Sequence, residues 1–328
     1  ALFLQQEIPT EKREAIFSDD ESKRKSFRDK NEWLAELKEN NVYNAKGYWR
    51  PFQIGFILLT LESIVNPESE YRETVDLLWF PTGGGKTEAY LGISALLLFY
   101  TRLNDKENDG VQILMRYTLR LLTAQQFERA SKLIVCMEII RKREELLRDQ
   151  KEFSIGIWVG GEVTPNTKSQ SITNWNEITE EYGQSGKKYK FILQACPWCR
   201  AEIGPVPYSR VSELKQDYKA KDRVLGLREK NGLVELHCPD PRCEFKKGLP
   251  IYVVDDDIYE KKPSMIISTV DKFARLIWKP NARELFGIDK NGNQKKQPPS
   301  LIIQDELHLI SNALGSTVGY FETIIEEF

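Results

Sequence analysis

The sequence predicts an α/β domain built on a parallel β-sheet and interrupted by a polar insertion. Three observations support this fold class. Short apolar runs alternate with longer segments of helical periodicity, a glycine cluster at residues 83–85 joins one such run to a helix, and the alternation fails between residues 162 and 262. We therefore expect one sheet-based domain with an inserted segment.

Composition limits the classes of protein that remain. The 328 residues are 41% hydrophobic, which is enough to bury a core. Lysine and arginine number 47 against 49 acids, so the net charge of −2 excludes a globally basic coat for nucleic acid, and any polyanion site must be local. No apolar run is long enough to span a membrane, and the first residues show no basic leader or cleavage site. We expect a soluble, cytoplasmic protein.

The first half of the chain supplies the elements before and after the glycines. Residues 1–47 are charge-dense and predict a solvated, helical N-terminal lead-in. Residues 48–64 carry apolar positions at helical spacing, with Pro51 in the first turn. The run from Thr74 to Phe80 is apolar without alternation, as in a strand buried on both faces of a parallel sheet. A helix is expected over residues 86–100.

The same alternation continues beyond the first helix. We expect a long helix from about Leu122 to Arg148, with an apolar side formed by Phe127, Ala130, Ile134 and Met137, and strands at residues 111–117, 155–159, 265–269 and 301–303. Residues 289–299 read as a surface loop. The predicted domain therefore comprises residues 48–161 and 263–328, and the insertion comprises residues 162–262.

The loop between the predicted strand and helix indicates a phosphate-binding site. Its residues are Pro81, Thr82, Gly83, Gly84, Gly85, Lys86 and Thr87. Glycines let successive backbone N–H groups turn towards a phosphate, and the helix N-terminus adds a favourable dipole. Lys86 would bring charge to the β- and γ-phosphates, and the Thr87 hydroxyl would bind Mg²⁺. The alternative is a glycine-rich turn that binds nothing.

The strand predicted at residues 301–303 leads directly into two acids, Asp305 and Glu306. An acid at the end of a parallel strand beside a phosphate loop can hold Mg²⁺, and the next acid can polarise the attacking water. We assign Asp305 to the metal and Glu306 to the general base, with Lys86 as the third catalytic residue. His308 is placed to sense the γ-phosphate or to relay to a partner lobe. The alternative is a pair of acids that complements a helix dipole.

The cysteines predict a metal site in the insertion. Four of the five form two close pairs, Cys196 with Cys199 and Cys238 with Cys243. In a chain without a signal peptide, such pairs favour a closed tetrahedral zinc site over disulfides. The metal would supply the folding free energy that a polar insertion lacks. Because the second spacing is looser, His237 remains a substitute ligand.

Taken together, these motifs resemble those of superfamily 2 helicases. Residues 81–87 resemble motif I, and residues 305–308 resemble motif II. Further similarities link residues 117–126 to motif Ia, 160–161 to the glycine pair that follows it, 268–276 to the threonine-containing motif before the Walker B strand, and 50–53 to the element whose glutamine reads adenine. Phe80 stands where the strict phosphate-loop pattern has glycine. Loops of such helicases commonly lack this glycine, so the departure favours helicases over small GTPases.

A narrower resemblance is to the helicase subunits of the DISARM anti-phage defence system. It is carried by residues 79–90, 304–311, 314–316 and 320–322. The resemblance covers about residues 48–161 and 263–324. It implies a RecA-like P-loop NTPase lobe that uses ATP, acts on DNA and works with a partner subunit of the defence system.

The resemblance also implies roles for single residues. Gln53 would read adenine, and the nucleotide would further contact Thr82, Gly83, Gly84, Gly85, Lys86, Thr87 and His308. The backbone of one nucleic-acid strand would contact Thr118, Arg120, Gln126, Gly161, Thr269 and Lys272, without reading sequence. For Arg120 and Lys272 the alternative is an ordinary solvated surface charge.

Motors of this superfamily hydrolyse ATP between two lobes, and the second lobe supplies an arginine finger. The motifs above account for the first lobe only. We therefore expect a helicase lobe that binds ATP but hydrolyses it poorly without the second RecA-like lobe of the same parent chain. The alternatives are a nucleotide-gated module that binds DNA or protein without translocation, and an RNA helicase.

Overall fold

The computed structural model describes residues 1–20, 24–40, 47–80, 84–117, 120–180, 189–273, 280–289 and 291–306. Contacts along the chain divide it into two compact units. The first unit comprises Ala1–Gln6, Lys46–Trp158 and Tyr259–Phe328, and the second comprises Glu7–Ala45 and Val159–Ile258.

The first unit contains parallel strands in the order β11, β3, β10, β4. They span β3 (Ile113–Tyr117), β4 (Ile155–Trp158), β10 (Met265–Thr269) and β11 (Leu301–Gln304). Every residue of β3, β4 and β10 is buried, as expected for parallel strands covered on both faces. The register sets Gln304 opposite Arg116 and Thr269 opposite Tyr117. The carboxyl ends of β11, β3 and β10 therefore meet at one edge of the sheet.

The helices of the first unit follow the predicted alternation. They are α1 (Leu2–Gln6), α3 (Pro51–Val65), α4 (Lys86–Asn104), α5 (Arg120–Arg143), α8 (Val270–Phe273), α9 (Pro280–Arg283) and the short 3₁₀ helix η5 (Glu284–Phe286). The predicted apolar side of α5 is buried, and α3 begins at Pro51 as expected. The helix α5 ends at Arg143 rather than at the predicted Arg148. Basic residues in its last turn complement the helix dipole.

The strand expected before the glycines does not form. Residues 74–80 belong to no helix or strand. Val75, Leu77 and Trp79 are 92%, 68% and 85% exposed. An apolar run predicts burial, but a strand also needs a neighbour for its backbone hydrogen bonds. The prediction of a buried strand at residues 74–80 is therefore wrong.

The remaining elements are short. They are β1 (Ile16–Phe17), β2 (Lys25–Ser26), α2 (Lys30–Glu39), α6 (Lys168–Glu180), β5 (Gly204–Pro205), η2 (Tyr208–Arg210), η3 (Ala220–Arg223), β6 (Val224–Leu225), β7 (Leu227–Lys230), β8 (Leu233–Leu236), β9 (Ile251–Tyr252) and α7 (Asp255–Lys261). In the second unit, β7 and β8 form a hairpin through Asn231 and Gly232, whose φ angles of 54° and 76° suit a two-residue turn.

The N-terminal segment contributes to the core of the second unit. Arg13, Phe27 and Trp33 are all buried there, and Arg13 pairs with Ala201 in a parallel bridge. Helix is confined to α1 and α2 among the described residues before residue 47. The described part of the N-terminal lead-in is therefore less solvated than its charge suggests. The domain boundary expected at residue 47 stays a prediction. Within the described ranges, none of the helices has the length and apolarity to cross a membrane.

Candidate nucleotide and zinc sites

The end of the predicted phosphate-binding loop is held by two side chains from the start of α3. Arg50 Nη1 donates to Gly84 O at 2.7 Å, and Gln53 Nε2 donates to Gly85 O at 2.7 Å. Gln53 Oε1 also accepts from the backbone N–H of Arg50 at 2.8 Å. Gly85 has a φ of 92°, and a Cβ atom there would lie 2.7 Å from Gln53 Nε2. The positive φ favours glycine here.

Lys86 opens α4 directly after Gly85. Its Nζ donates to the carbonyl oxygen of Phe80 at 3.1 Å, so the ammonium group turns back towards the loop. Glu88, in the same first turn, pairs with Arg129 of α5. Of the predicted loop residues, Pro81, Thr82 and Gly83 lie outside the described residues.

A cavity of about 490 Å³ lies beside this loop, within the first unit. It is lined by loop and helix residues Gly85, Lys86, Thr87, Glu88, Gln126 and Arg129, by Tyr48, Trp49, Arg50 and Gln53 around the start of α3, and by Leu2, Phe3, Gln6 and Gly47. Its size falls within the range of small-molecule and cofactor sites. Tyr48 and Trp49 are 86% and 41% exposed, so an aromatic face is accessible to a ligand base.

The hydroxyl group of Tyr90 joins the predicted phosphate loop to Asp305, which follows β11. Its oxygen lies 2.9 Å from Asp305 Oδ2, 3.1 Å from Thr87 Oγ1 and 3.1 Å from the hydroxyl oxygen of Tyr117. Burial raises the pKa of Tyr90 and of Tyr117 far above the ordinary value for tyrosine. Both phenols are therefore neutral hydrogen-bond donors. The two predicted magnesium ligands, Thr87 and Asp305, contact the same hydroxyl group.

Asp305 and Glu306 leave β11 in a constrained conformation. The Asp305 N–H donates to Arg116 O at 3.2 Å, and Asp305 Oδ1 accepts from the N–H of Glu306 at 2.9 Å. Glu306 has a φ of 52°, which is the left-handed region that non-glycine residues adopt at an energetic cost. Such strain concentrates at functional sites. His308 lies outside the described residues.

Sequence reasoning missed the two tyrosines of this network. A signal existed for Tyr90, because it lies three residues after Thr87 and hence on the same helix face. Tyr117 ends β3, and its meeting with Asp305 depends on β11 being the neighbour of β3. That strand order could not be predicted from the sequence.

Two of the residues predicted to contact nucleic acid are buried in the structure. Thr269 and Lys272 are 1% and 4% exposed, and Lys272 Nζ lies 5.9 Å from the centre of the Trp158 ring. An ordinary surface charge is therefore the wrong interpretation of Lys272. Gln126 lines the cavity beside the loop, while Gly161 O accepts from Lys190 Nζ at 3.1 Å in the second unit. Thr118 and the side chain of Arg120 lie outside the described part.

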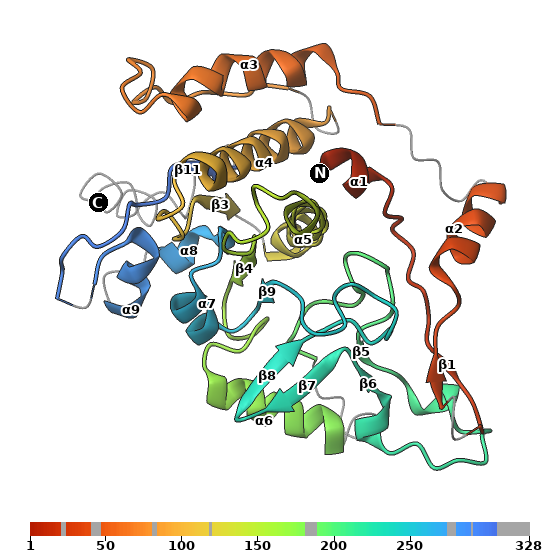
Figure 1. The fold of residues 1–328 in the computed structure, drawn as a ribbon. Coiled ribbons are helices and arrows are strands. Elements are labelled where there is room, and N and C mark those ends of the chain that lie inside the picture. The colour runs from red at the N-terminus through yellow and green to blue at the C-terminus, as the bar shows by residue number, and fades with distance from the viewer. Residues whose placement is uncertain are drawn as a thin grey trace. The chain divides into compact units, whose positions relative to one another are not determined.

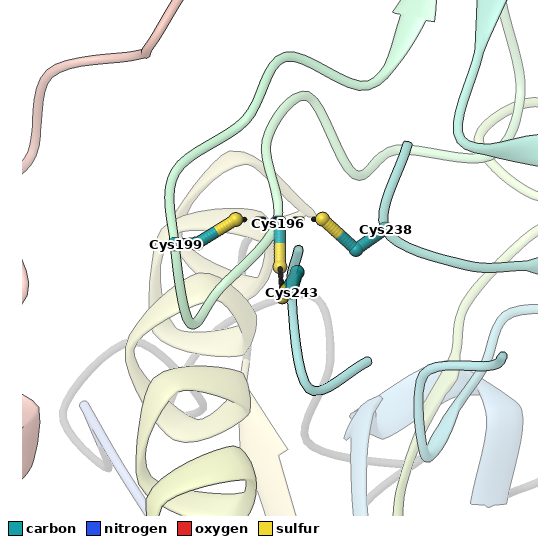
Figure 2. Close-up of side chains that lie close together, drawn as sticks. All are labelled: Cys196, Cys199, Cys238 and Cys243. Carbon is teal, nitrogen blue, oxygen red and sulfur yellow. Dashed lines mark hydrogen bonds between the residues drawn. The ribbon is translucent and has the colours of Figure 1, made fainter. Parts of the chain in front are cut away.

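The four paired cysteines of the second unit converge (Figure 2). The Sγ atoms of Cys196, Cys199, Cys238 and Cys243 all lie within 4.8 Å of one another. The pair Cys196 and Cys243 is separated by 4.0 Å, and the pair Cys199 and Cys238 by 3.4 Å. A tetrahedral site with Zn–S bonds near 2.3 Å has sulfur–sulfur edges of about 3.8 Å. The four buried thiols, none of which forms a disulfide, therefore fit zinc.

His237 is not a member of this group. The cluster found among the described residues contains cysteines only. His237 Nδ1 instead lies 2.9 Å from Cys238 O, and burial lowers the pKa of the imidazole. The geometry therefore favours four cysteine ligands over a set that substitutes His237.

Arg13 connects the two cysteine loops. Its Nε donates to Cys199 O at 3.2 Å, and its Nη2 pairs with Asp240 Oδ2 at 2.8 Å. Asp240 lies between the second pair of cysteines, and its carbonyl oxygen accepts from the N–H of Cys243 at 3.0 Å. Outer contacts of this kind orient metal ligands. Sequence reasoning missed Arg13, because it lies far from the cysteines along the chain.

The chain is similar to a known DISARM protein. No protein-family model matches the chain. The chain is 40% identical, over an alignment of 351 residues, to the DISARM protein DrmA of Bacillus paralicheniformis; the match covers 95% of this chain but 29% of that relative. The predicted resemblance to a DISARM protein is thereby confirmed over nearly the whole of this chain. Its assignment to superfamily 2 stays a prediction.

Proposed function

We propose that this DrmA-like chain is the first, RecA-like lobe of an ATP-dependent superfamily 2 motor that acts on DNA in anti-phage defence. The observation that carries the proposal is the network in which Tyr90 links Thr87 of the phosphate loop to Asp305 after β11. Two motifs that are far apart in the sequence are thereby joined next to a cavity of nucleotide size. Since the match covers 29% of the relative, the motor activity is proposed for a longer protein that contains this lobe.

The loop and the start of α4 would hold the phosphates of ATP. Backbone N–H groups at a helix N-terminus and after glycines attract anions. Lys86 Nζ, which here donates to the neutral carbonyl of Phe80, would exchange that acceptor for phosphate oxygens. A charge-assisted hydrogen bond of this kind is about twice as strong as a neutral one.

Gln53 is proposed to read adenine while it supports the loop. Its amide spends one N–H on Gly85 O and one lone pair on the N–H of Arg50. An amide side chain offers two donors and two acceptor positions, so it retains capacity for one further bond of each kind. Trp49 lines the same cavity and offers a face on which a base can stack.

Thr87 and Asp305 are the residues that would hold Mg²⁺. Their oxygens form a hard donor set, which suits this cation, and the ion would offset the charge of the phosphates. Glu306, the next residue, would accept the proton of the attacking water. The hydrogen bond from its N–H to Asp305 Oδ1 ties the base to the cation ligand.

Nucleic-acid binding and a defence partner are proposed from the resemblance and from the relative's name. Thr269 and Lys272 would have to become exposed to contact a strand, because both are buried here. We also propose that the four cysteines hold a structural zinc ion. Its role is to stabilise the insertion, since four protein ligands leave no position open for catalysis.

Nucleotide binding is the first test. The affinity of the chain for a fluorescent ATP analogue is measured with Mg²⁺, alongside Lys86→Ala. Loss of a charged hydrogen bond to phosphate costs about 1.5–3 kcal/mol, so we expect binding about tenfold to a hundredfold weaker in the variant. Equal affinity of the two proteins would contradict the proposed phosphate site.

Hydrolysis separates a motor lobe from the alternatives. We expect the chain to hydrolyse ATP slowly, and Glu306→Gln to bind ATP normally without hydrolysing it. In the longer protein, DNA should stimulate hydrolysis more than RNA does. Robust DNA-stimulated turnover by the 328-residue chain alone would refute a lobe that depends on a second lobe. A nucleotide-gated module would give a different pair of results. ATP would still change the nucleic-acid affinity of Glu306→Gln, and the longer protein would not translocate.

A further inference from the structure

The hydroxyl group of Tyr90 is saturated by the two proposed cation ligands and a second tyrosine. Within hydrogen-bonding distance lie Asp305 Oδ2, Thr87 Oγ1 and the Tyr117 hydroxyl. A phenol has one proton to donate and two lone pairs to accept with. Three partners therefore use its whole capacity, and the proposed nucleotide chemistry gives this residue no role of its own.

The count of protons fixes the direction of these bonds. A carboxylate that ligates a cation offers only acceptor oxygens, so the single proton of Tyr90 is directed at Asp305 Oδ2, which is also the shortest of the three contacts at 2.9 Å. The hydroxyls of Tyr117 and Thr87 can rotate, and both then donate to the Tyr90 oxygen. Once the proton of Thr87 is directed at Tyr90, the lone pairs of its oxygen are left to face a cation.

The fold keeps the network in place from three elements. Tyr90 lies in the buried part of α4, and Tyr117 is 1% exposed at the end of β3. The register sets Gln304 beside Arg116, so Asp305 follows alongside Tyr117. The hydroxyl groups of Tyr90 and Tyr117 are therefore carried by packed elements, and Asp305 directly follows the strand β11.

We propose that Tyr90 is a positioning residue for the metal–nucleotide complex: supported by Tyr117, its hydroxyl fixes the Asp305 carboxylate and the Thr87 hydroxyl as a preformed pair of cation ligands. This inference rests on the proposed function and adds to it a residue that acts through the ligands. Removing a hydrogen-bond partner of a metal ligand typically lowers metal affinity about tenfold to a hundredfold.

The test separates metal-dependent from metal-independent nucleotide binding. Affinity for fluorescent ADP is measured with Mg²⁺ and again with EDTA, for the full chain and for Tyr90→Phe. We expect about tenfold or greater weakening with Mg²⁺ and unchanged affinity in EDTA. Binding of Mn²⁺ to the ADP-loaded protein, followed by electron paramagnetic resonance, reports the metal directly and should weaken by the same factor.

Tyr100→Phe is the matched control. Tyr100 lies on the same helix, and its hydroxyl donates to Val65 O at 2.7 Å, so this variant loses one tyrosine hydrogen bond away from the site. We expect its binding to equal that of the unmodified chain under both conditions. A similar loss in Tyr100→Phe and Tyr90→Phe would overturn the proposal, because it would indicate a general effect on α4.

Tyr117→Phe supplies a second variant should Tyr90→Phe fold poorly. Because Tyr117 acts through Tyr90, we expect a smaller loss of Mg²⁺-dependent affinity, and no additional loss when both changes are combined. Unchanged Mg²⁺-dependent binding in Tyr90→Phe, when the unmodified chain shows it, overturns this inference alone. An unmodified chain whose nucleotide binding ignores Mg²⁺, or that binds no nucleotide, would instead overturn the proposed function.

Discussion

At the scale of single residues, a buried ion pair shows how the N-terminal segment is tied to the cysteine loops. The side chains of Arg13 and Asp240 are 1% and 4% exposed and lie 2.8 Å apart. Two charges removed from water are costly unless they are paired and hydrogen-bonded. Arg13 satisfies this condition through Cys199 O and the carbonyl of Arg28.

Arg13→Ala should therefore be strongly destabilising. Breaking a buried ion pair costs about 3–5 kcal/mol, because one charge is left without its partner. We expect the lower end of that range, since Arg242 Nε also lies 3.2 Å from Asp240 Oδ1. The free energy of unfolding in urea measures the loss.

Arg228→Ala is the control in the same unit. Arg228 pairs with Glu235 across the β7–β8 hairpin at 2.9 Å, but the two side chains are 39% and 41% exposed. Exposed pairs contribute about 0–1 kcal/mol, so this variant should unfold nearly as the unmodified chain does. Equal losses in the two variants would show that burial of the Arg13 pair has no special effect.

At the scale of elements, α3 lies beside α4 (Figure 1), and this close approach depends on Gly92. A Cβ atom at this position would lie 2.9 Å from Trp49 Cη2 and 3.0 Å from Ile57 Cδ1. Contacts at these distances force a neighbour to move. Trp49 also lines the cavity beside the phosphate loop, so the packing of the two helices affects the proposed nucleotide site.

The glycines of α3 and α4 provide a matched pair of variants. Alanine favours a helix over glycine by about 1 kcal/mol. Gly55→Ala should therefore stabilise the protein by roughly that amount, because its Cβ meets nothing within 4 Å. Gly92→Ala should lose this gain to the clash and destabilise the protein, as seen by thermal unfolding. Stabilisation of both variants would show that α3 and α4 are not closely packed at Gly92.

Elements with a local signal were predicted well from the sequence. The apolar periodicity of α5 and the apolar runs of β3, β4, β10 and β11 were sufficient, and the burial of Phe127 and Ile134 agrees with the prediction. The prediction of a strand at residues 74–80 was wrong because a strand forms only beside a pairing strand, which composition does not encode. For the same reason only part of the site could be predicted. Thr87 and Asp305 belong to recognisable sequence motifs, whereas the contact of Tyr117 with this site depends on β3 pairing with β11.

At the scale of the whole molecule, the two units have different sources of stability. The first contains long helices and buried parallel strands, which supply an apolar core. The second consists largely of two- to four-residue strands and short helices, and its interior includes the four cysteines and the buried charges Arg13 and Asp240. Small polar modules of this kind usually depend on a metal to fold.

Zinc removal should therefore unfold the second unit and leave the first one folded. We expect one zinc ion per chain, and its removal by a chelator should abolish amide hydrogen-exchange protection in β7, β8 and the described residues around Arg13. Protection of β3, β10 and α5 should persist, and the affinity for an ATP analogue should change by less than about twofold, because the first unit has its own core.

Cys199→Ser should reproduce the effect of the chelator. Cys136→Ser, which changes a buried cysteine of α5 outside the cluster, should keep the zinc content of the unmodified chain. Simultaneous loss of protection in both units would show instead that their stabilities are coupled, and a zinc-free protein with full protection would show that the cysteines stabilise the unit without a metal.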